Sequence, residues 1–186
     1  MAGMTVPAVD RVSALIRDVK DFPEPGIVFK DVMPLLGDPA AFEAAVDAMA
    51  APWQDRVPGD EITKVAGVES RGFLFGVPIA QRLSVGFVPI RKQGKLPAQT
   101  VSASYSREYG PDKIEMHTDA VGPGDRVLVV DDVLATAGTA AAAAELLGAA
   151  GAAVAGFAVL IELEFLSGRA LLSGFRVESV LSFGGD

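Results

Sequence analysis

The sequence predicts an α/β fold, in which a mainly parallel twisted sheet is flanked by helices and a small N-terminal hood covers the carboxyl ends of the strands. Segments with helical spacing of apolar residues alternate with short apolar runs. The run Val-Leu-Val-Val at 127–130 is typical of a central strand buried on both faces. Half of the 186 residues are hydrophobic, which suits one domain. We expect a hood over about residues 1–34 and an α/β core over about residues 35–186.

The N-terminal part is predicted to be a helix followed by an extended arm. Apolar residues recur at three- and four-residue spacing over residues 9–19, which indicates an amphipathic helix. Two prolines and a glycine within residues 21–31 exclude a helix there and favour an extended arm. Asp38 followed by Pro39 then marks the start of a second helix, with an apolar stripe that reaches Met49.

The remaining chain alternates between strands and helices. We expect strands at about 62–67, 86–91, 113–118, 127–130, 153–161 and 175–181, and helices at about 72–83 and 139–150, with a short helix before the last strand. The segment 95–112 is the exception, because it is long and polar and shows no period. We predict a functional loop there.

Composition excludes several classes of function. A net charge of -8 argues against binding along a nucleic-acid backbone, although a local cradle of amides can still hold a small anion. The absence of cysteine excludes disulfides and thiolate metal sites, and the single histidine, His117, excludes a multi-histidine metal site. The apolar stretch 133–161 carries Glu145 and fits a helix and a buried strand better than a membrane span. No export signal is apparent, so we expect a cytoplasmic protein.

The strongest functional signal is the segment 127–139, VLVVDDVLATAGT. Small residues allow the backbone to wrap closely, and the amides of a helix start, with the hydroxyls of Thr136 and Thr139, favour a phosphate pocket. Asp131 and Asp132 at the strand end suit ribose hydroxyls. The segment lacks the lysine of a Walker loop and the G-x-G-x-x-G pattern. We interpret it as a ribose 5-phosphate site; an ordinary tight turn, the alternative, explains neither the acids nor the threonines.

Two further segments carry groups suited to anions. In residues 66–73, AGVESRGF, the planar fork of Arg71 and the amides of Ser70 and Gly72 suit a pyrophosphate. Residues 90–97, IRKQGKLP, place three cations beside a strand end, where they can stabilise a departing anion. The alternatives are a surface ion pair for the arginine and a solvated face for the basic run.

Together these motifs resemble those of the type I phosphoribosyltransferases, in the family's order and from about Arg11 to Leu181. The resemblance implies binding of phosphoribosyl pyrophosphate (PRPP) by Asp131, Asp132, Ala135, Thr136, Ala137, Gly138 and Thr139. It implies contacts to pyrophosphate from Glu69, Ser70, Arg71, Gly72 and Lys92. Ala137 stands where glycine is usual, and alanine costs about 1 kcal/mol if the position has a positive φ.

Two other segments resemble the adenine-specific members of that family. Residues 103–110, ASYSREYG, resemble their mobile catalytic loop, which implies that Glu108 exchanges a proton with the purine. Residues 22–31, FPEPGIVFKD, resemble their adenine-recognition arm. In that arm, backbone groups near Val28 and Lys30 would read the purine edge and Phe29 would stack on its face.

The alternatives are an exposed loop acid at position 108 and an ordinary core phenylalanine at position 29. Lys30 and Glu69 stand where arginine and aspartate are frequent. Both exchanges keep the charge and alter the geometry.

The resemblance implies an enzyme of purine salvage that transfers the 5-phosphoribosyl group of PRPP to adenine and gives AMP and pyrophosphate. It also implies Mg²⁺ held mainly by PRPP and water rather than by direct protein ligands, and a homodimer. Neither nucleic acid nor a membrane is expected as a partner. Two alternatives stay open: transfer to another base, such as hypoxanthine, guanine or xanthine, and a PRPP-sensing regulator without catalysis. The regulator would need an added DNA-binding region and would need neither Glu108 nor the arm.

Overall fold

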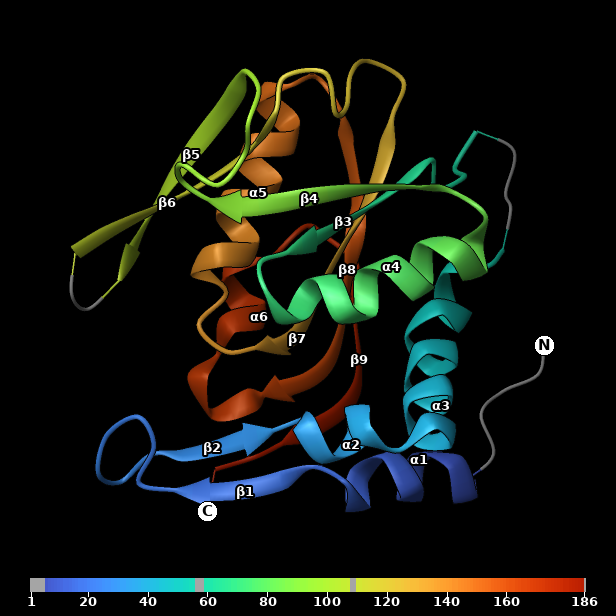
Figure 1. Ribbon diagram of the computed structural model, residues 1–186, viewed down its shortest axis with the longest axis vertical. Helices are drawn as coiled ribbons and strands as arrows, with labels where there is room; N and C mark the ends of the chain where they lie inside the picture. The colour runs from blue at the N-terminus through green and yellow to red at the C-terminus, as the bar shows by residue number, and fades with distance from the viewer. Residues whose placement is uncertain (1–5, 56–58, 108–109, 186) are drawn as a thin grey trace.

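The computed structural model describes residues 6–55, 59–107 and 110–185 and is built around a seven-stranded sheet (Figure 1). The strand order is β5-β6-β4-β3-β7-β8-β9. The strands are β3 (Lys64–Val68), β4 (Gly86–Lys92), β5 (Thr100–Arg107), β6 (Gly110–His117), β7 (Arg126–Leu134), β8 (Ala153–Leu163) and β9 (Val177–Phe183). The five strands from β4 to β9 in this order are parallel, and β6 runs antiparallel to β4 and β5. The predicted α/β class with a mainly parallel sheet is confirmed.

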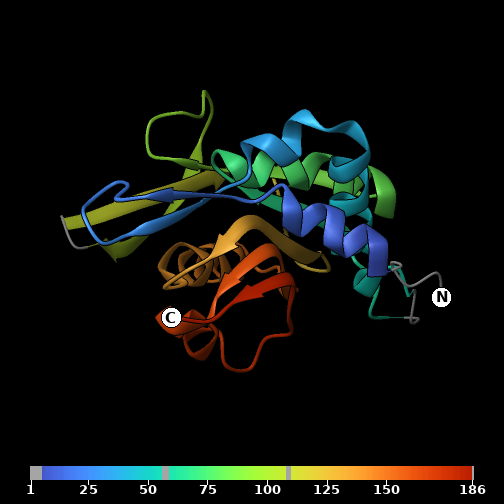
Figure 2. The same ribbon diagram turned by 90° about the horizontal axis from the view of Figure 1, so that it is seen from below.

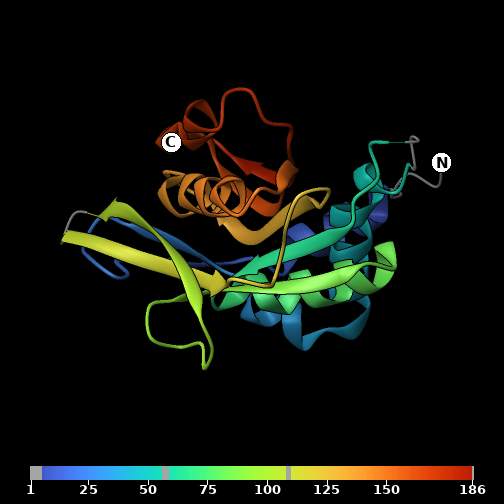
Figure 3. The same cartoon turned by 90° about the horizontal axis from the view of Figure 1, so that it is seen from above.

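Helices cover both faces of the sheet, with α5 on one face and α3 and α4 on the other (Figure 3). The helices are α1 (Val6–Ala14), α2 (Met33–Gly37), α3 (Pro39–Ala50), α4 (Arg71–Leu83), α5 (Gly138–Ala149) and α6 (Gly168–Leu171), with 3₁₀ turns η1 (Ala51–Trp53) and η2 (Glu164–Leu166). Asp38 begins α3 as predicted, since its carboxylate accepts the Ala41 amide at 2.9 Å. Within the described ranges, no helix is both long and apolar enough to cross a bilayer.

Strand β7 divides the core into two clusters. Val127 and Val129 belong to the cluster under α5, whereas Leu128 and Val130 belong to the cluster under α3 and α4. Because successive side chains of a strand point to opposite faces, β7 is buried on both, as its apolar run predicts. The polar residues that follow Val130 are therefore held on a strand that is packed on both faces.

The hood differs from the expected helix and arm. Helix α1 ends at Ala14, and residues 17–20 form β1 (Arg17–Lys20), which pairs antiparallel with β2 (Val28–Asp31). The prediction of a helix over residues 9–19 was therefore too long at its carboxyl end. The arm supplies a strand partner for residues 17–20, and the Arg17 guanidinium pairs with Asp31 across the two strands. The pairing of the two strands satisfies the backbone hydrogen-bonding groups of residues 17–20, which in a longer helix would have bonded within the helix.

The segment 95–112 is not the irregular loop that its polarity predicted. Most of it forms the antiparallel hairpin of β5 and β6. Ala103 and Tyr105 are buried, whereas Ser102 and Ser104 are exposed, so the side chains alternate with the period of two that a strand has. Small and hydroxylated residues differ little in hydropathy, which hid this period in the sequence. Figures 1 and 2 show this hairpin and the β1–β2 hairpin projecting from the same side of the sheet.

Candidate active site

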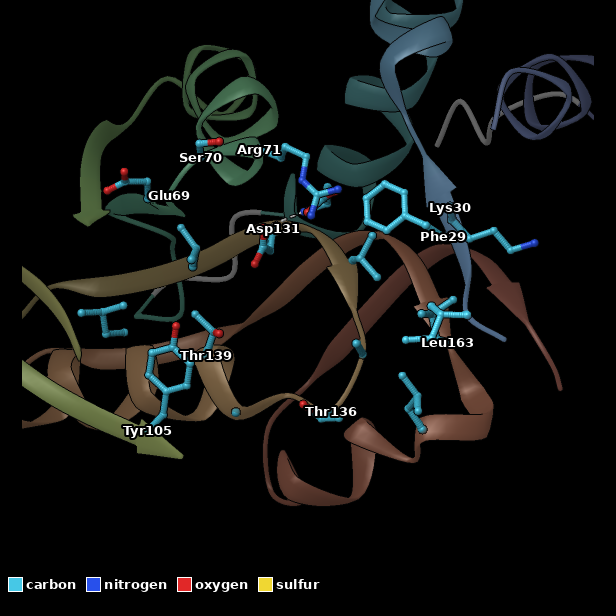
Figure 4. Close-up of a pocket in the computed structure, with 18 of the residues that line it drawn as sticks. Phe29, Lys30, Glu69, Ser70, Arg71, Tyr105, Asp131, Thr136, Thr139 and Leu163 are labelled. Atoms are coloured by element: carbon cyan, nitrogen blue, oxygen red, sulfur yellow. Dashed lines mark hydrogen bonds and ion pairs between the residues drawn. The ribbon is translucent and has the colours of Figure 1, made fainter. Parts of the chain in front are cut away.

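A cavity of about 990 Å³ lies at the carboxyl ends of β3, β4 and β7 (Figure 4). Of the residues predicted from the sequence, it is lined by Val28, Phe29, Lys30, Glu69, Ser70, Arg71, Lys92, Asp131, Asp132, Ala135, Thr136, Gly138 and Thr139. Gly72 and Ala137 are close by but do not line this cavity. Glu108 lies outside the described residues. The fold thus brings together predicted residues from four parts of the chain, at the sheet edge where α/β folds bind ligands.

Residues 135–139, here called the phosphate loop, connect β7 to α5. No side chain caps the start of α5, so the first amides of this helix have no intrahelical or capping acceptor. A second cavity of about 100 Å³ adjoins these amides and is lined in part by Thr136, Gly138 and Thr139. Free amides, hydroxyls and the positive end of the helix dipole together make a site for an anion.

Ala137 has a positive φ of 63°, the conformation that alanine disfavours. The left-handed conformation costs about 1 kcal/mol relative to glycine. Ala137 is 6% exposed and belongs to the core cluster under α5, so burial of its methyl group returns about 0.8 kcal/mol. The departure from glycine at this position is therefore nearly neutral for the stability of the phosphate loop.

Asp131 and Asp132 form an acidic pair beside the phosphate loop, in which Asp132 is buried and Asp131 is half-buried. Asp132 is 3% exposed, and its Oδ2 lies 3.0 Å from Nη1 of Arg71, in an ion pair whose angle is too poor for a hydrogen bond. Burial, and then the neighbouring Asp132 carboxylate, raise the pKa of Asp131 well above its ordinary value. Burial also raises the pKa of Asp132, against the opposing effect of Arg71. Ligand hydroxyls that donate to these carboxylates would favour their charged form.

Gly72 permits the start of α4 to approach β7. A Cβ atom at this position would lie 2.7 Å from the carbonyl oxygen of Val130 and 3.2 Å from Oδ1 of Asp131. Any larger residue would push the helix away from the acids. Gly72 therefore places Arg71 next to Asp132 without itself lining the cavity.

The loop after β3 is coupled to the basic turn after β4. The Glu69 carboxylate lies 3.1 Å from Nε of Arg91 and accepts the Lys92 amide at 3.0 Å. Burial raises the pKa of Glu69, but the hydrogen bonds from Arg91 and Lys92 outweigh it and lower the pKa below its ordinary value. The Glu69–Ser70 peptide bond is cis. The Glu69 carboxylate is itself an anion and the Glu69 amide donates to the Ile90 carbonyl at 2.9 Å, so the amides that follow Glu69 are the groups of this loop that can face an anion.

Glu115 shapes the same basic turn and was missed in the sequence. It lies on β6 with 5% exposure, and one carboxylate oxygen accepts the amides of Gly94, Lys95 and Leu96 at 3.0, 3.2 and 3.3 Å. The available signal was an acid between two apolar residues of a predicted strand. Such a buried acid must find donors, and the neighbouring turn supplies them.

The hood contributes an aromatic wall. The Phe29 ring lies 5.2 Å from the Arg71 guanidinium carbon and 5.3 Å from the Phe22 ring. Lys30 turns its ammonium away from the cavity to Asp18, at 2.7 Å, which leaves its backbone on the cavity side. Strand β2 has β1 as its one partner among the described strands, so its second edge can hydrogen-bond to a ligand.

Leu163 and Leu166 also line the cavity and were missed in the sequence. Leu163 ends β8, and Leu166 belongs to the 3₁₀ turn that follows. In the sequence, only their position near the carboxyl end of a predicted strand could have indicated that they line the site. With Phe29 they give one part of the cavity an apolar lining suited to a planar ring, next to groups suited to a sugar phosphate.

Comparisons with known proteins agree with one another. The family model of the phosphoribosyl transferase domain matches residues 36–169. An adenine phosphoribosyltransferase of a Nocardioides species is 51% identical over 182 residues, which cover 98% of this chain and 98% of that protein. The crystal structure of adenine phosphoribosyltransferase from Rhodothermus marinus matches with a TM-score of 0.89 at 51% identity, over 96% of this chain and 100% of that one. The Saccharomyces cerevisiae enzyme, solved with an iminoaltritol bisphosphate and adenine, matches with a TM-score of 0.90 at 38% identity, over 95% and 100%.

Proposed function

The chain belongs to the phosphoribosyltransferase family, among the adenine phosphoribosyltransferases, and from this membership we propose that it transfers the 5-phosphoribosyl group of PRPP to adenine. The products are AMP and pyrophosphate, and the reaction serves purine salvage. One structural observation supports this function independently of the similarity to known proteins. A single cavity joins an uncapped helix start, a pair of adjacent acids and an apolar wall with a phenylalanine.

Each part of the cavity has a task in this reaction. The amides and hydroxyls of the phosphate loop hold the 5′-phosphate, and Asp131 and Asp132 accept hydrogen bonds from the ribose hydroxyls. As the bond from ribose C1 to pyrophosphate breaks, positive charge develops on the ribose, and N9 of adenine attacks from the opposite face. Arg71 and Lys92 stabilise the negative charge on the departing pyrophosphate.

The base is held by the hood and the opposite wall. Phe29 stacks on adenine, and backbone groups of Val28 and Lys30 on the open edge of β2 read its polar edge. Glu69, Ser70 and Gly72 contribute loop backbone to the pyrophosphate site. A base bound between the two walls excludes water from the developing cation, which would otherwise hydrolyse PRPP.

The site also fits Mg²⁺ bound mainly by PRPP oxygens and water. Within the described ranges, no group of three or more His, Cys, Asp or Glu side chains is placed to hold a metal. Of the three acids that line the cavity, Glu69 is already engaged by Arg91 and Asp132 by Arg71. Mg²⁺ commonly binds with few carboxylates when a substrate phosphate supplies the other oxygens, and it would neutralise charge on the pyrophosphate.

Glu108 is proposed as the group that takes the N9 proton of adenine. We expect Glu108→Ala to lower kcat about 100-fold, because a positioned base is lost, while the melting temperature changes little. Steady-state kinetics and thermal unfolding of the same preparations measure both effects. Asp119→Ala, which removes an exposed acid outside the predicted site, serves as the control. Turnover of Glu108→Ala at the wild-type rate would rule out a chemical role for Glu108.

The decisive test of the function is the release of pyrophosphate from PRPP and Mg²⁺ with each candidate base. We expect release with adenine and at least a 100-fold smaller kcat/KM with hypoxanthine, guanine, xanthine or orotate, since a site built to hydrogen-bond one base edge leaves groups unpaired with another. Release with a base other than adenine would overturn the substrate assignment. PRPP binding without product from any base would favour the regulator.

Three further features are part of the proposal. The chain forms one domain, with its hood over about residues 1–34 and its α/β core over about residues 35–186. It forms a homodimer, for which the exposed Leu74 and Val77, one turn apart on α4, offer apolar contact surface. It acts in the cytoplasm, on adenine and PRPP rather than on nucleic acid or at a membrane.

A further inference from the structure

The segment 164–176, which follows β8, buries few apolar side chains, although at its carboxyl end the Phe175 ring lies 5.5 Å from the Phe157 ring. Gly168 and Leu172 are its only buried residues. Leu172 packs into the core cluster under α5. The segment includes α6, and in Figure 4 its ribbon runs next to Thr136 of the phosphate loop. A segment with so little apolar burial needs polar contacts to fix its position.

Gly168 is in direct backbone contact with the phosphate loop. A Cβ atom at this position would lie 2.0 Å from the carbonyl oxygen of Ala135 and 3.1 Å from the amide nitrogen of Ala137. Non-bonded carbon and oxygen atoms are attracted only beyond about 3 Å. A shift of α6 toward the loop is therefore blocked, and a shift away removes support from the carbonyl of Ala135.

The next residue, Arg169, ties α6 to two strands. Its Nε donates to Oε1 of Glu162 on β8 at 2.8 Å, its Nη2 donates to the other carboxylate oxygen, and its Nη1 donates to the Val177 carbonyl at 2.8 Å. Ser179 of β9 donates to the same carboxylate at 2.9 Å. Hydrogen bonds from Arg169, opposed by burial, lower the pKa of Glu162, so the pair is charged at neutral pH.

We propose that Arg169, through its two-pronged ion pair with Glu162, is a positioning residue for PRPP, because it holds Gly168 against Ala135 and so sets the shape of the phosphate loop. This inference rests on the proposed function. Neither Arg169 nor Glu162 is among the described residues that line the cavity. Their effect must pass through the backbone contact, and a lysine cannot replace the planar fork.

The experiment measures binding of ribose 5-phosphate and of PRPP with Mg²⁺ by calorimetry, together with kcat and the KM for each substrate, well below the melting temperature. We expect Arg169→Met and the nearly isosteric Glu162→Gln each to weaken ribose 5-phosphate binding about tenfold, and Gly168→Ala to weaken it about 100-fold, the cost of a displacement near 1 Å. Arg169→Lys should recover part of the loss. The KM for adenine and the kcat at saturating PRPP should change less than about twofold. The reason is that the phosphate contact contributes equally to binding of the ground state and of the transition state, so its loss weakens binding without slowing the chemical step.

A double variant tests whether the two residues act as one unit. The protein that carries both Arg169→Met and Glu162→Gln should have the same affinity for ribose 5-phosphate as whichever single variant binds it less tightly. Arg176→Met is the matched control, since Arg176 lies in the same segment, pairs with half-exposed Glu178 at 2.8 Å and lies over the Trp53 ring, away from the phosphate loop. Wild-type affinity in Arg169→Met and Glu162→Gln, with only a lower melting temperature, would overturn the positioning role. Failure of the wild-type protein to bind PRPP would instead overturn the proposed function.

Discussion

In the double variant Asp131→Asn and Asp132→Asn, we expect PRPP affinity to fall about 1000-fold, while the fold persists. In the proposed site each acid accepts a charge-assisted hydrogen bond from ribose, and such a bond contributes about 1.5–3 kcal/mol. Isothermal calorimetry with PRPP and Mg²⁺ measures the loss. Asp119→Asn, which changes an exposed acid after β6, is the control and should bind as the wild type does. Unchanged PRPP affinity in the double variant would remove the ribose assignment.

The same double variant should unfold at a higher temperature than the wild type at pH 8, with a gain of about 1 kcal/mol in free energy of unfolding. In the folded protein the pKa of Asp131 is raised above its ordinary value of 3.8, first by burial and then by Asp132. The folded state then binds more protons than the unfolded state, so wild-type stability falls as the pH rises from 3.8 through the raised pKa. The gain should therefore disappear below 3.8, where the acids are protonated in both states. A gain that does not depend on pH would contradict this account.

In Arg71→Met we expect kcat/KM to fall about 1000-fold and the free energy of unfolding at pH 8 to fall by about 2 kcal/mol. The kinetic loss follows from removal of a fixed cation beside the pyrophosphate. The stability loss follows because Asp132, 3% exposed, keeps its charge without a partner. This loss in free energy of unfolding is smaller than the loss expected for a fully buried ion pair, since the Arg71 side chain is 34% exposed.

The dependence on pH identifies the cause of that stability loss. Without Arg71 the pKa of Asp132 rises further, so the destabilisation should shrink as the pH falls and Asp132 takes up a proton. Adding Asp132→Asn to Arg71→Met should restore stability but not turnover. Arg82→Met, at the other end of α4, breaks an exposed pair with Asp47 and should cost less than about 0.5 kcal/mol. An equal loss in both variants would show that Arg71 contributes packing rather than charge.

Several elements could be predicted because their signals are local. The alternation of strand and helix, the N-cap at Asp38 and the apolar run of β7 each depend on residues within a few positions. The motif segments were found for the same reason, since each is a short loop after a strand. The helix over residues 9–19 and the loop over 95–112 were wrong where strand pairing with a distant segment decided the outcome.

What the sequence by itself determined is the α/β class, the order of its motifs and the kinds of group that gather at the carboxyl edge of the sheet. Only the tertiary structure decided how those groups are paired: Glu69 with Arg91, Lys30 with Asp18, and Arg71 between Phe29 and Asp132. It also revealed Glu115 and Arg169 as supports of the loops. The physical reason is distance along the chain. A loop motif carries its chemistry in neighbouring residues, whereas the partner of a buried charge is whichever donor packing brings within about 3 Å.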